Sequence, residues 1–131
     1  MKTQQIILSF IFIIATAFTA SAQKKVDPTA KKETFKVWGE CGMCKKHIEK
    51  AAKESGATAA NWDTDSKMLT VSYSTAKTSN QKIQEAIAAV GYDTRDLVAD
   101  NSAYNKLDEC CKYDRKAAAA ASAKTDSTHH H

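Results

Sequence analysis

The sequence predicts an α+β fold in which two helices cover one face of an antiparallel sheet. Short runs alternate apolar and polar residues with the period of a half-buried strand, and two longer runs repeat apolar residues at helical spacing. A glycine follows each helical run, where a residue in the left-handed conformation commonly ends a helix. The 131 residues leave room for one small core and one domain.

The first part of the domain is predicted to be a strand, a loop and a helix. In residues 33–38, Phe35 and Val37 fall on one side of a strand. Residues 44–55 then predict a helix, and Gly56 stands at its end. The positions of this helix that recur at helical spacing are Ile48, Ala51, Ala52 and Ser55.

A pair of strands and a second helix follow. Residues 57–63 and 67–73 predict two strands joined by a polar turn. Residues 79–90 predict the helix, with capping-box spacing between Thr78 and Gln81. One strand face consists of Leu69, Val71 and Tyr73, and the helix stripe of Ile83, Ala86, Ile87 and Val90, before Gly91.

Residues 93–99, which include Leu97, predict a last strand. The predicted order is therefore β-α-β-β-α-β, which is the ferredoxin-like arrangement. Residues 100–115 form a cysteine-containing extension. Within it, residues 104–113 predict a short helix that folds back on the domain, and residues 116–131 are a low-complexity tail ending in three histidines. The shared face of the short helix consists of Tyr104, Leu107, Cys110 and Cys111.

Residues 1–22 have the pattern of a signal peptide. Lys2 supplies the charged start, residues 6–18 the apolar core, and a small-residue box ends at Ala22. The apolar run is shorter than the roughly 20 residues that a membrane-spanning helix needs. We therefore expect cleavage after Ala22 and a soluble periplasmic or secreted product without stable membrane insertion, which begins with a flexible lead-in at residues 23–32. The alternative is an uncleaved anchor.

The most informative motif is the Cys-x-x-Cys pair of Cys41 and Cys44, where the first strand gives way to the first helix. Two thiols so placed converge on one ion, and the free N–H groups of a helix start favour the thiolate form. Thiolates prefer soft cations, so Cu(I) ranks first and Hg(II), Zn(II) and Cd(II) are rivals. The motif predicts an exposed metal site from which a partner's thiol can withdraw the ion.

Cys110 and Cys111 are candidate further metal ligands. If the extension packs beside the first helix, these residues complete a three- or four-coordinate site. Adjacent cysteines cannot easily direct both sulfurs to one ion, so one ligand from the extension is expected more than two. Near the motif, His47 and Met43 are alternative ligands, Met43 through a weak thioether bond, but His47 is interpreted as a solvated side chain and Met43 as a packing residue. The alternative use of the cysteines is a disulfide between the two pairs, because a bond within either pair closes almost no loop.

Other functional classes fit the sequence less well. A thiol-disulfide oxidoreductase also uses Cys-x-x-Cys, but no proline follows Cys44 and the second half lacks the strand and helix that a thioredoxin-like fold adds. A disulfide-braced structural module is a third option. The formal net charge of +4 is mild and the lysines are scattered, so no nucleic-acid partner is expected.

The order of elements, the Cys-x-x-Cys loop and the Gly-Tyr-Asp sequence around Tyr92 resemble the heavy-metal-associated domain over residues 33–99. That family includes copper chaperones, modules of copper-pumping ATPases and the periplasmic mercury-binding protein. The resemblance implies that Cys41 and Cys44 bind metal, that Tyr92 lies close to them, and that the chain is a non-enzymatic chaperone or scavenger. It also implies a metal transporter or efflux component as partner. Gly39 stands where the family usually has a buried methionine.

Overall fold

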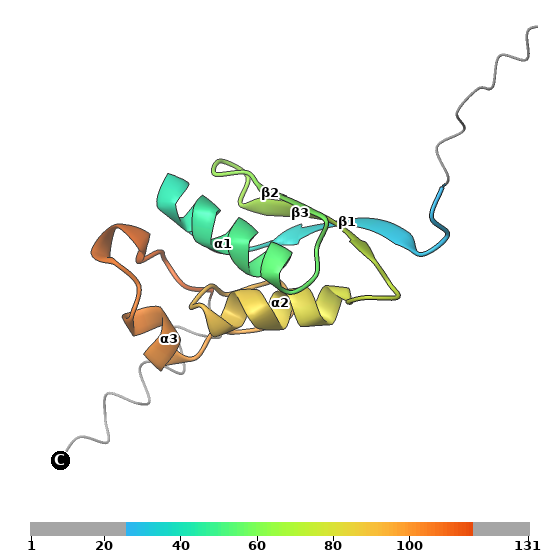
Figure 1. Cartoon of the computed structure of the whole chain (residues 1–131). Coiled ribbons are helices and arrows are strands. Elements are labelled where there is room, and N and C mark those ends of the chain that lie inside the picture. The colour runs from blue at the N-terminus through green and yellow to red at the C-terminus, as the bar shows by residue number, and fades with distance from the viewer. Residues whose placement is uncertain (1–25, 117–131) are drawn as a thin grey trace, which may run out of the picture.

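A three-stranded antiparallel sheet and two helices packed on one of its faces form the domain (Figure 1). The computed structural model describes residues 26–116, so the predicted signal peptide at residues 1–22 and nearly all of the tail at residues 116–131 lie outside the described residues. The strands lie in the order β1-β3-β2. In chain order the elements are β1 Ala30–Lys36, α1 Gly42–Glu54, β2 Ala59–Trp62, β3 Met68–Ser74, α2 Asn80–Ala89, α3 Asn101–Asn105 and the 3-10 turn η1 Glu109–Cys111.

Strand β3 lies at the centre of the sheet and pairs with both neighbours. Its side chains alternate between buried and partly exposed positions, as the period-two pattern predicts. β1 pairs with β3 over its whole length, beginning with Ala30 opposite Ser74. The strand therefore starts inside the segment that was predicted to be a flexible lead-in. The buried face of β3 consists of Leu69, Val71 and Tyr73, which confirms the prediction.

Helix α1 begins directly after Cys41, which is its N-cap residue. The residues that it buries against the sheet are Cys44, Ile48, Ala51 and Ala52. Gly56 follows the helix with φ of +110°, the left-handed conformation that the sequence predicted there.

Helix α2 is capped by Ser79 and not by the predicted Thr78. The Ser79 side chain accepts a hydrogen bond from the Lys82 N–H at 3.2 Å, whereas the Thr78 hydroxyl is buried and has no partner among the described residues. At the other end, Gly91 has φ of +103° and leads the chain out of the helix. Val90, predicted as buried, is 43% exposed because the helix ends before it.

The predicted last strand at residues 93–99 is reduced to a single bridge between Thr94 and Val37. Backbone hydrogen bonds on either side of this bridge join the segment to the end of β1. The chain then turns at once, since the Thr94 N–H donates to the Leu97 carbonyl at 2.8 Å. The Thr94 hydroxyl donates to Gln84 of α2 at 2.7 Å. Buried polar contacts thus take the place of a ladder, and the fold is a ferredoxin-like α+β fold with a shortened fourth strand.

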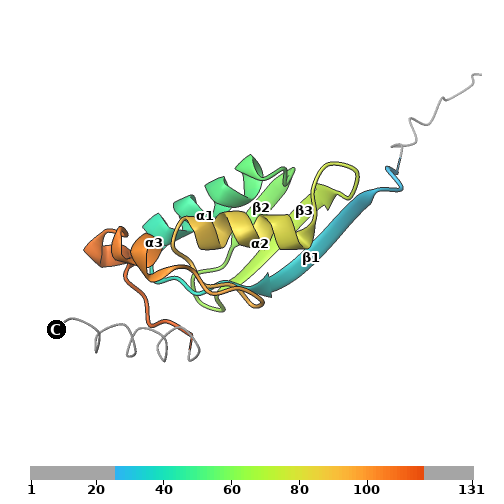
Figure 2. The same ribbon diagram turned by 90° about the horizontal axis from the view of Figure 1, so that it is seen from below.

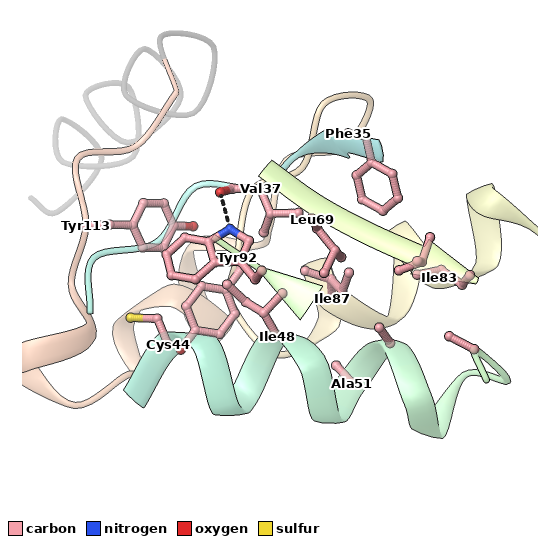
Figure 3. Close-up of a cluster of buried hydrophobic side chains, with 14 of the residues drawn as sticks. Phe35, Val37, Cys44, Ile48, Ala51, Leu69, Ile83, Ile87, Tyr92 and Tyr113 are labelled. Atoms are coloured by element: carbon pink, nitrogen blue, oxygen red, sulfur yellow. Dashed lines mark hydrogen bonds between the residues drawn. The ribbon is translucent and has the colours of Figure 1, made fainter. Parts of the chain in front are cut away.

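The core lies between the sheet and the two helices (Figure 3). Trp62 is fully buried in it and donates from Nε1 to the Val37 carbonyl at 3.0 Å, the dashed line in Figure 3. Gly39 lies against this ring, because a Cβ atom at position 39 would come within 2.9 Å of it. Trp62 is therefore a packing residue of the core.

The extension folds back on the domain as two short helical segments, α3 and η1, where one short helix was predicted. Figure 2 shows it at the end of the domain where α1 begins. Within residues 26–116, no helix is both long enough and apolar enough to cross a membrane.

Candidate metal centre

The start of α1 places two thiols at one end of the domain. The Sγ atoms of Cys41 and Cys44 are 3.9 Å apart. The Cys44 side chain is fully buried and accepts a hydrogen bond from the Glu40 N–H at 3.4 Å, whereas Cys41 is partly exposed. The two residues of the Cys-x-x-Cys motif therefore turn their sulfurs toward each other, with one of them at the surface.

Segment η1 brings a third thiol to this pair. The Sγ atoms of Cys41, Cys44 and Cys111 all lie within 4.8 Å of one another, and we call these three residues the thiol cluster. Cys41 Sγ also donates to the Cys110 carbonyl oxygen at 3.3 Å, and Cys44 Sγ donates to that of Cys111 at 3.8 Å. The four cysteines are free thiols.

Cys110 lies at the rim of the thiol cluster. Its side chain is exposed, and its Sγ atom is 4.0 Å from Cys111 Sγ and 3.7 Å from Met43 Sδ. Three of the four predicted ligands are therefore gathered at one point, and the fourth is left outside. This placement agrees with the expectation that adjacent cysteines direct only one sulfur to a shared position.

The local environment favours the thiolate at one member of the cluster and the thiol at another. Backbone N–H groups of Cys44 and then Met43, at the start of α1, lower the pKa of Cys41. Burial, followed by the proximity of Cys44, raises the pKa of Cys111 to about 12. Binding of a cation by all three sulfurs would therefore release a proton from Cys111.

The spacing of the thiol cluster fits three-coordinate binding. With a metal–sulfur bond of about 2.3 Å, three sulfurs around one ion lie about 4.0 Å apart, and two sulfurs in a line lie about 4.6 Å apart. The observed distance between Cys41 Sγ and Cys44 Sγ is 3.9 Å. The Cys41–Cys44 pair therefore has the separation of two sulfurs of a trigonal site, and Cys111 Sγ lies within 4.8 Å of both.

Tyr92 lies beside the thiol cluster, as the resemblance implied, and Figure 3 shows it with Cys44, a member of the cluster. It is fully buried, and its hydroxyl is 3.0 Å from His47 Nδ1. His47 is half-buried through this contact, so its interpretation as a solvated residue is wrong. Burial, and then the neighbouring thiols of Cys44 and Cys111, raise the pKa of Tyr92, which keeps its hydroxyl protonated.

Tyr113 fastens the extension to the domain, and no sequence pattern predicted this role. The buried Tyr113 hydroxyl donates to the Gly91 carbonyl and accepts from the Asp93 N–H, each at 2.8 Å. Its ring stacks on Tyr92 with 5.8 Å between centroids. Because Tyr113 lies just beyond Cys111 in the chain, these contacts fix where the third thiol lies.

A buried ion pair between Arg115 and Asp93 provides a second attachment. The two side chains are 7% and 0% exposed, and Arg115 donates to both carboxylate oxygens, at 2.7 and 3.1 Å. Arg115 also donates to Asn101 at 2.6 Å. The sequence shows an acidic residue after the second predicted helix and a basic residue in the extension. It does not indicate that these two residues form an ion pair.

A ferredoxin-like domain that gathers thiols at the start of its first helix defines a small metal-binding module. Residues 34–93 match the sequence profile of the heavy-metal-associated domain, and the chain belongs to that family. The extension lies beyond the end of this match. No curated protein matches the chain significantly.

Several solved structures are similar to this chain. The CopZ metallochaperone is 30% identical, with 49% of this chain and 98% of that chain covered and a TM-score of 0.47. Oxidized MerP from Ralstonia metallidurans is 28% identical, with 50% and 93% covered and a TM-score of 0.47. The N-terminal domain of a potential copper-translocating P-type ATPase from Bacillus subtilis, in its Cu(I)-loaded state, is 27% identical, with 50% and 84% covered and a TM-score of 0.47.

Proposed function

We propose that this chain is an exported, non-enzymatic metal-binding protein that carries a soft cation, with Cu(I) ranked first and Hg(II), Zn(II) or Cd(II) as alternatives. Cys41 and Cys44 bind the ion and Cys111 supplies a third sulfur. The observation that carries the proposal is the convergence of these three Sγ atoms within 4.8 Å. Export rests on the signal-peptide pattern of residues 1–22.

The donor set supports the ranking of the ions. Thiolate sulfur selects soft cations, and a set of three matches Cu(I) or Hg(II) better than structural Zn(II), which takes four ligands.

The uneven exposure of the cluster supports a carrier that holds its cargo firmly. Cys41 is partly exposed, so a thiol of a metal transporter or efflux component has access to the ion from that side. Cys44 and Cys111 are fully buried, so a thiol of a partner protein reaches these two sulfurs only if the extension moves. The arrangement supports retention and scavenging more than rapid delivery.

Substitution of single thiols tests the proposal. In titrations of the reduced protein with Cu(I) against a chromogenic chelator, Cys41→Ser and Cys44→Ser should abolish retention of the ion, because the remaining sulfur of the motif then shares the ion only with Cys111, which depends on the extension for its position. Cys111→Ser should keep binding but weaken it at least about tenfold, the factor that ~1.4 kcal/mol represents. Cys110→Ser is the control and should retain the tightly bound ion.

Two results would contradict the proposal. Wild-type affinity in both Cys41→Ser and Cys44→Ser would rule out the motif as the site. Catalytic reduction of a test disulfide by the metal-free protein would support the rival class, a thiol-disulfide oxidoreductase, instead.

A further inference from the structure

We propose that Met43 and Cys110 form a second, outer site for a soft monovalent cation at the rim of the thiol cluster. The inference rests on the proposed function and adds a place where the ion binds before it reaches the buried sulfurs. Neither residue is one that the family motif assigns to metal binding.

The two residues come together from segments far apart in the sequence. Met43 lies in the first turn of α1 and is 46% exposed, and Cys110 lies exposed in η1. Cys110 Sγ is 3.7 Å from Met43 Sδ. The sequence-based interpretation of Met43 as a packing residue is therefore wrong, because the thioether is at the surface and faces a thiol.

The sulfur pair has the chemistry and the spacing of a weak site. Two sulfurs that each lie about 2.3 Å from one ion are at most about 4.6 Å apart, and a shorter separation gives a bent arrangement. The observed 3.7 Å falls in the bent range. A thioether and a thiolate are both soft donors, so the pair selects Cu(I) or Ag(I). The pair has one anionic ligand and the thiol cluster has three, so the pair binds the ion more weakly.

The outer pair adjoins the thiol cluster, which gives the ion a route inward. Cys110 Sγ is 4.0 Å from Cys111 Sγ. In the first exchange a metal–sulfur bond to Cys111 forms, the bond to Met43 breaks, and the Cys111 proton leaves to water. Cys44 then replaces Cys110, which takes up a proton as the proton of Cys44 is released. The oxidation state of the ion is unchanged throughout.

Counting bound ions tests the outer site. The reduced, full-length mature protein is titrated anaerobically with Cu(I), and native mass spectrometry records how many ions each variant holds. We expect two ions in the wild type, one held against a chelator and one lost to it. Cys110→Ser and Met43→Leu should each lose the weaker ion and keep the tighter one.

Met68→Leu is the matched control, because Met68 belongs to β3 and lies opposite Lys36 of β1. It should bind two ions. A wild type that binds a single ion, or a Cys110→Ser variant that still binds two, overturns the outer site while the proposed function stands. A wild type that retains no Cu(I) overturns both.

Discussion

Gly39 is the residue at which this chain departs from the usual motif of its family, and Trp62 gives the physical reason. A Cβ atom at position 39 would lie 2.9 Å from the Trp62 ring and 3.2 Å from Ile48. The ring cannot move aside easily, since it is fully buried and bonded to the Val37 carbonyl. In this chain the indole fills the space beside residue 39, so that position accommodates no side chain.

The first prediction concerns this contact. Gly39→Ala should lower the free energy of unfolding by about 1–3 kcal/mol, the usual cost of an added methyl group in a packed core. Urea denaturation of the metal-free protein measures the change. Gly42→Ala is the matched control, because a Cβ atom there meets nothing within 4 Å, and it should be neutral or slightly stabilising. Equal stability of the Gly39→Ala variant and the wild type would contradict the packing argument.

At the scale of single residues, the site was predictable where the signal was local. The spacing of Cys41 and Cys44 relative to a helix start indicates that their sulfurs meet. Which of Cys110 and Cys111 lies inward depends on how η1 turns, and a sequence does not give that angle. The interpretations of His47 and Met43 were wrong for a related reason, because their surroundings include residues from distant parts of the chain.

At the scale of the elements, buried contacts attach the extension to the rest of the domain. Tyr113 and Arg115 join it to residues 91–93, the segment that directly follows α2. The same segment was predicted as a regular strand. It forms one bridge instead, because Asp93 and Thr94 turn their side chains into buried polar contacts that periodicity does not reveal. The two helices and the three strands before this segment follow their predicted patterns closely.

A second prediction tests this attachment. Arg115→Met removes the partner of a fully buried carboxylate, a change that typically costs about 3–5 kcal/mol. The extension should therefore detach, and Cys111 should react with iodoacetamide about as fast as the exposed Cys110. Peptide mass spectrometry after timed alkylation gives both rates, and circular dichroism shows whether the domain stays folded.

The control for this experiment is Arg95→Met, because Arg95 pairs with Asp96 at the surface, where both side chains are more than half exposed. In that variant Cys111 should stay protected. Protection of Cys111 in the Arg115→Met variant would contradict the attachment role of the ion pair.

At the scale of the whole molecule, Glu33 links β1, β3 and α2. It accepts hydrogen bonds from the Tyr73 hydroxyl at 2.8 Å and from Asn80 at 2.6 Å, and it pairs with Lys31 at 2.8 Å. Bonds from Lys31 first and then Tyr73 lower the pKa of Glu33 from 4.5 to about 2. The folded state therefore favours the ionised carboxylate more than the unfolded chain does.

The sign of the pH dependence follows from this shift. The stabilisation by Glu33 is complete above pH 4.5 and is lost as the pH falls toward about 2. Glu33→Gln should lower stability at neutral pH and reduce the loss of stability on acidification. Urea denaturation at several pH values measures both effects. Glu54→Gln, at a position where the side chain is 68% exposed, should leave the profile unchanged. An unaltered pH profile in the Glu33→Gln variant would count against this assignment.

The thiol cluster joins the beginning of α1 to a segment near the end of the described chain, since Cys111 follows Cys44 by 67 positions. An ion held by both residues is therefore a reversible cross-link over most of the domain. On chain-entropy grounds a covalent link of this length stabilises a fold by roughly 4 kcal/mol, and a ligand that binds only the native state adds to its stability in the same direction. The metal-bound protein should therefore resist proteolysis for longer than the metal-free protein. The lifetime of the protein then depends on how much of the ion is available to it.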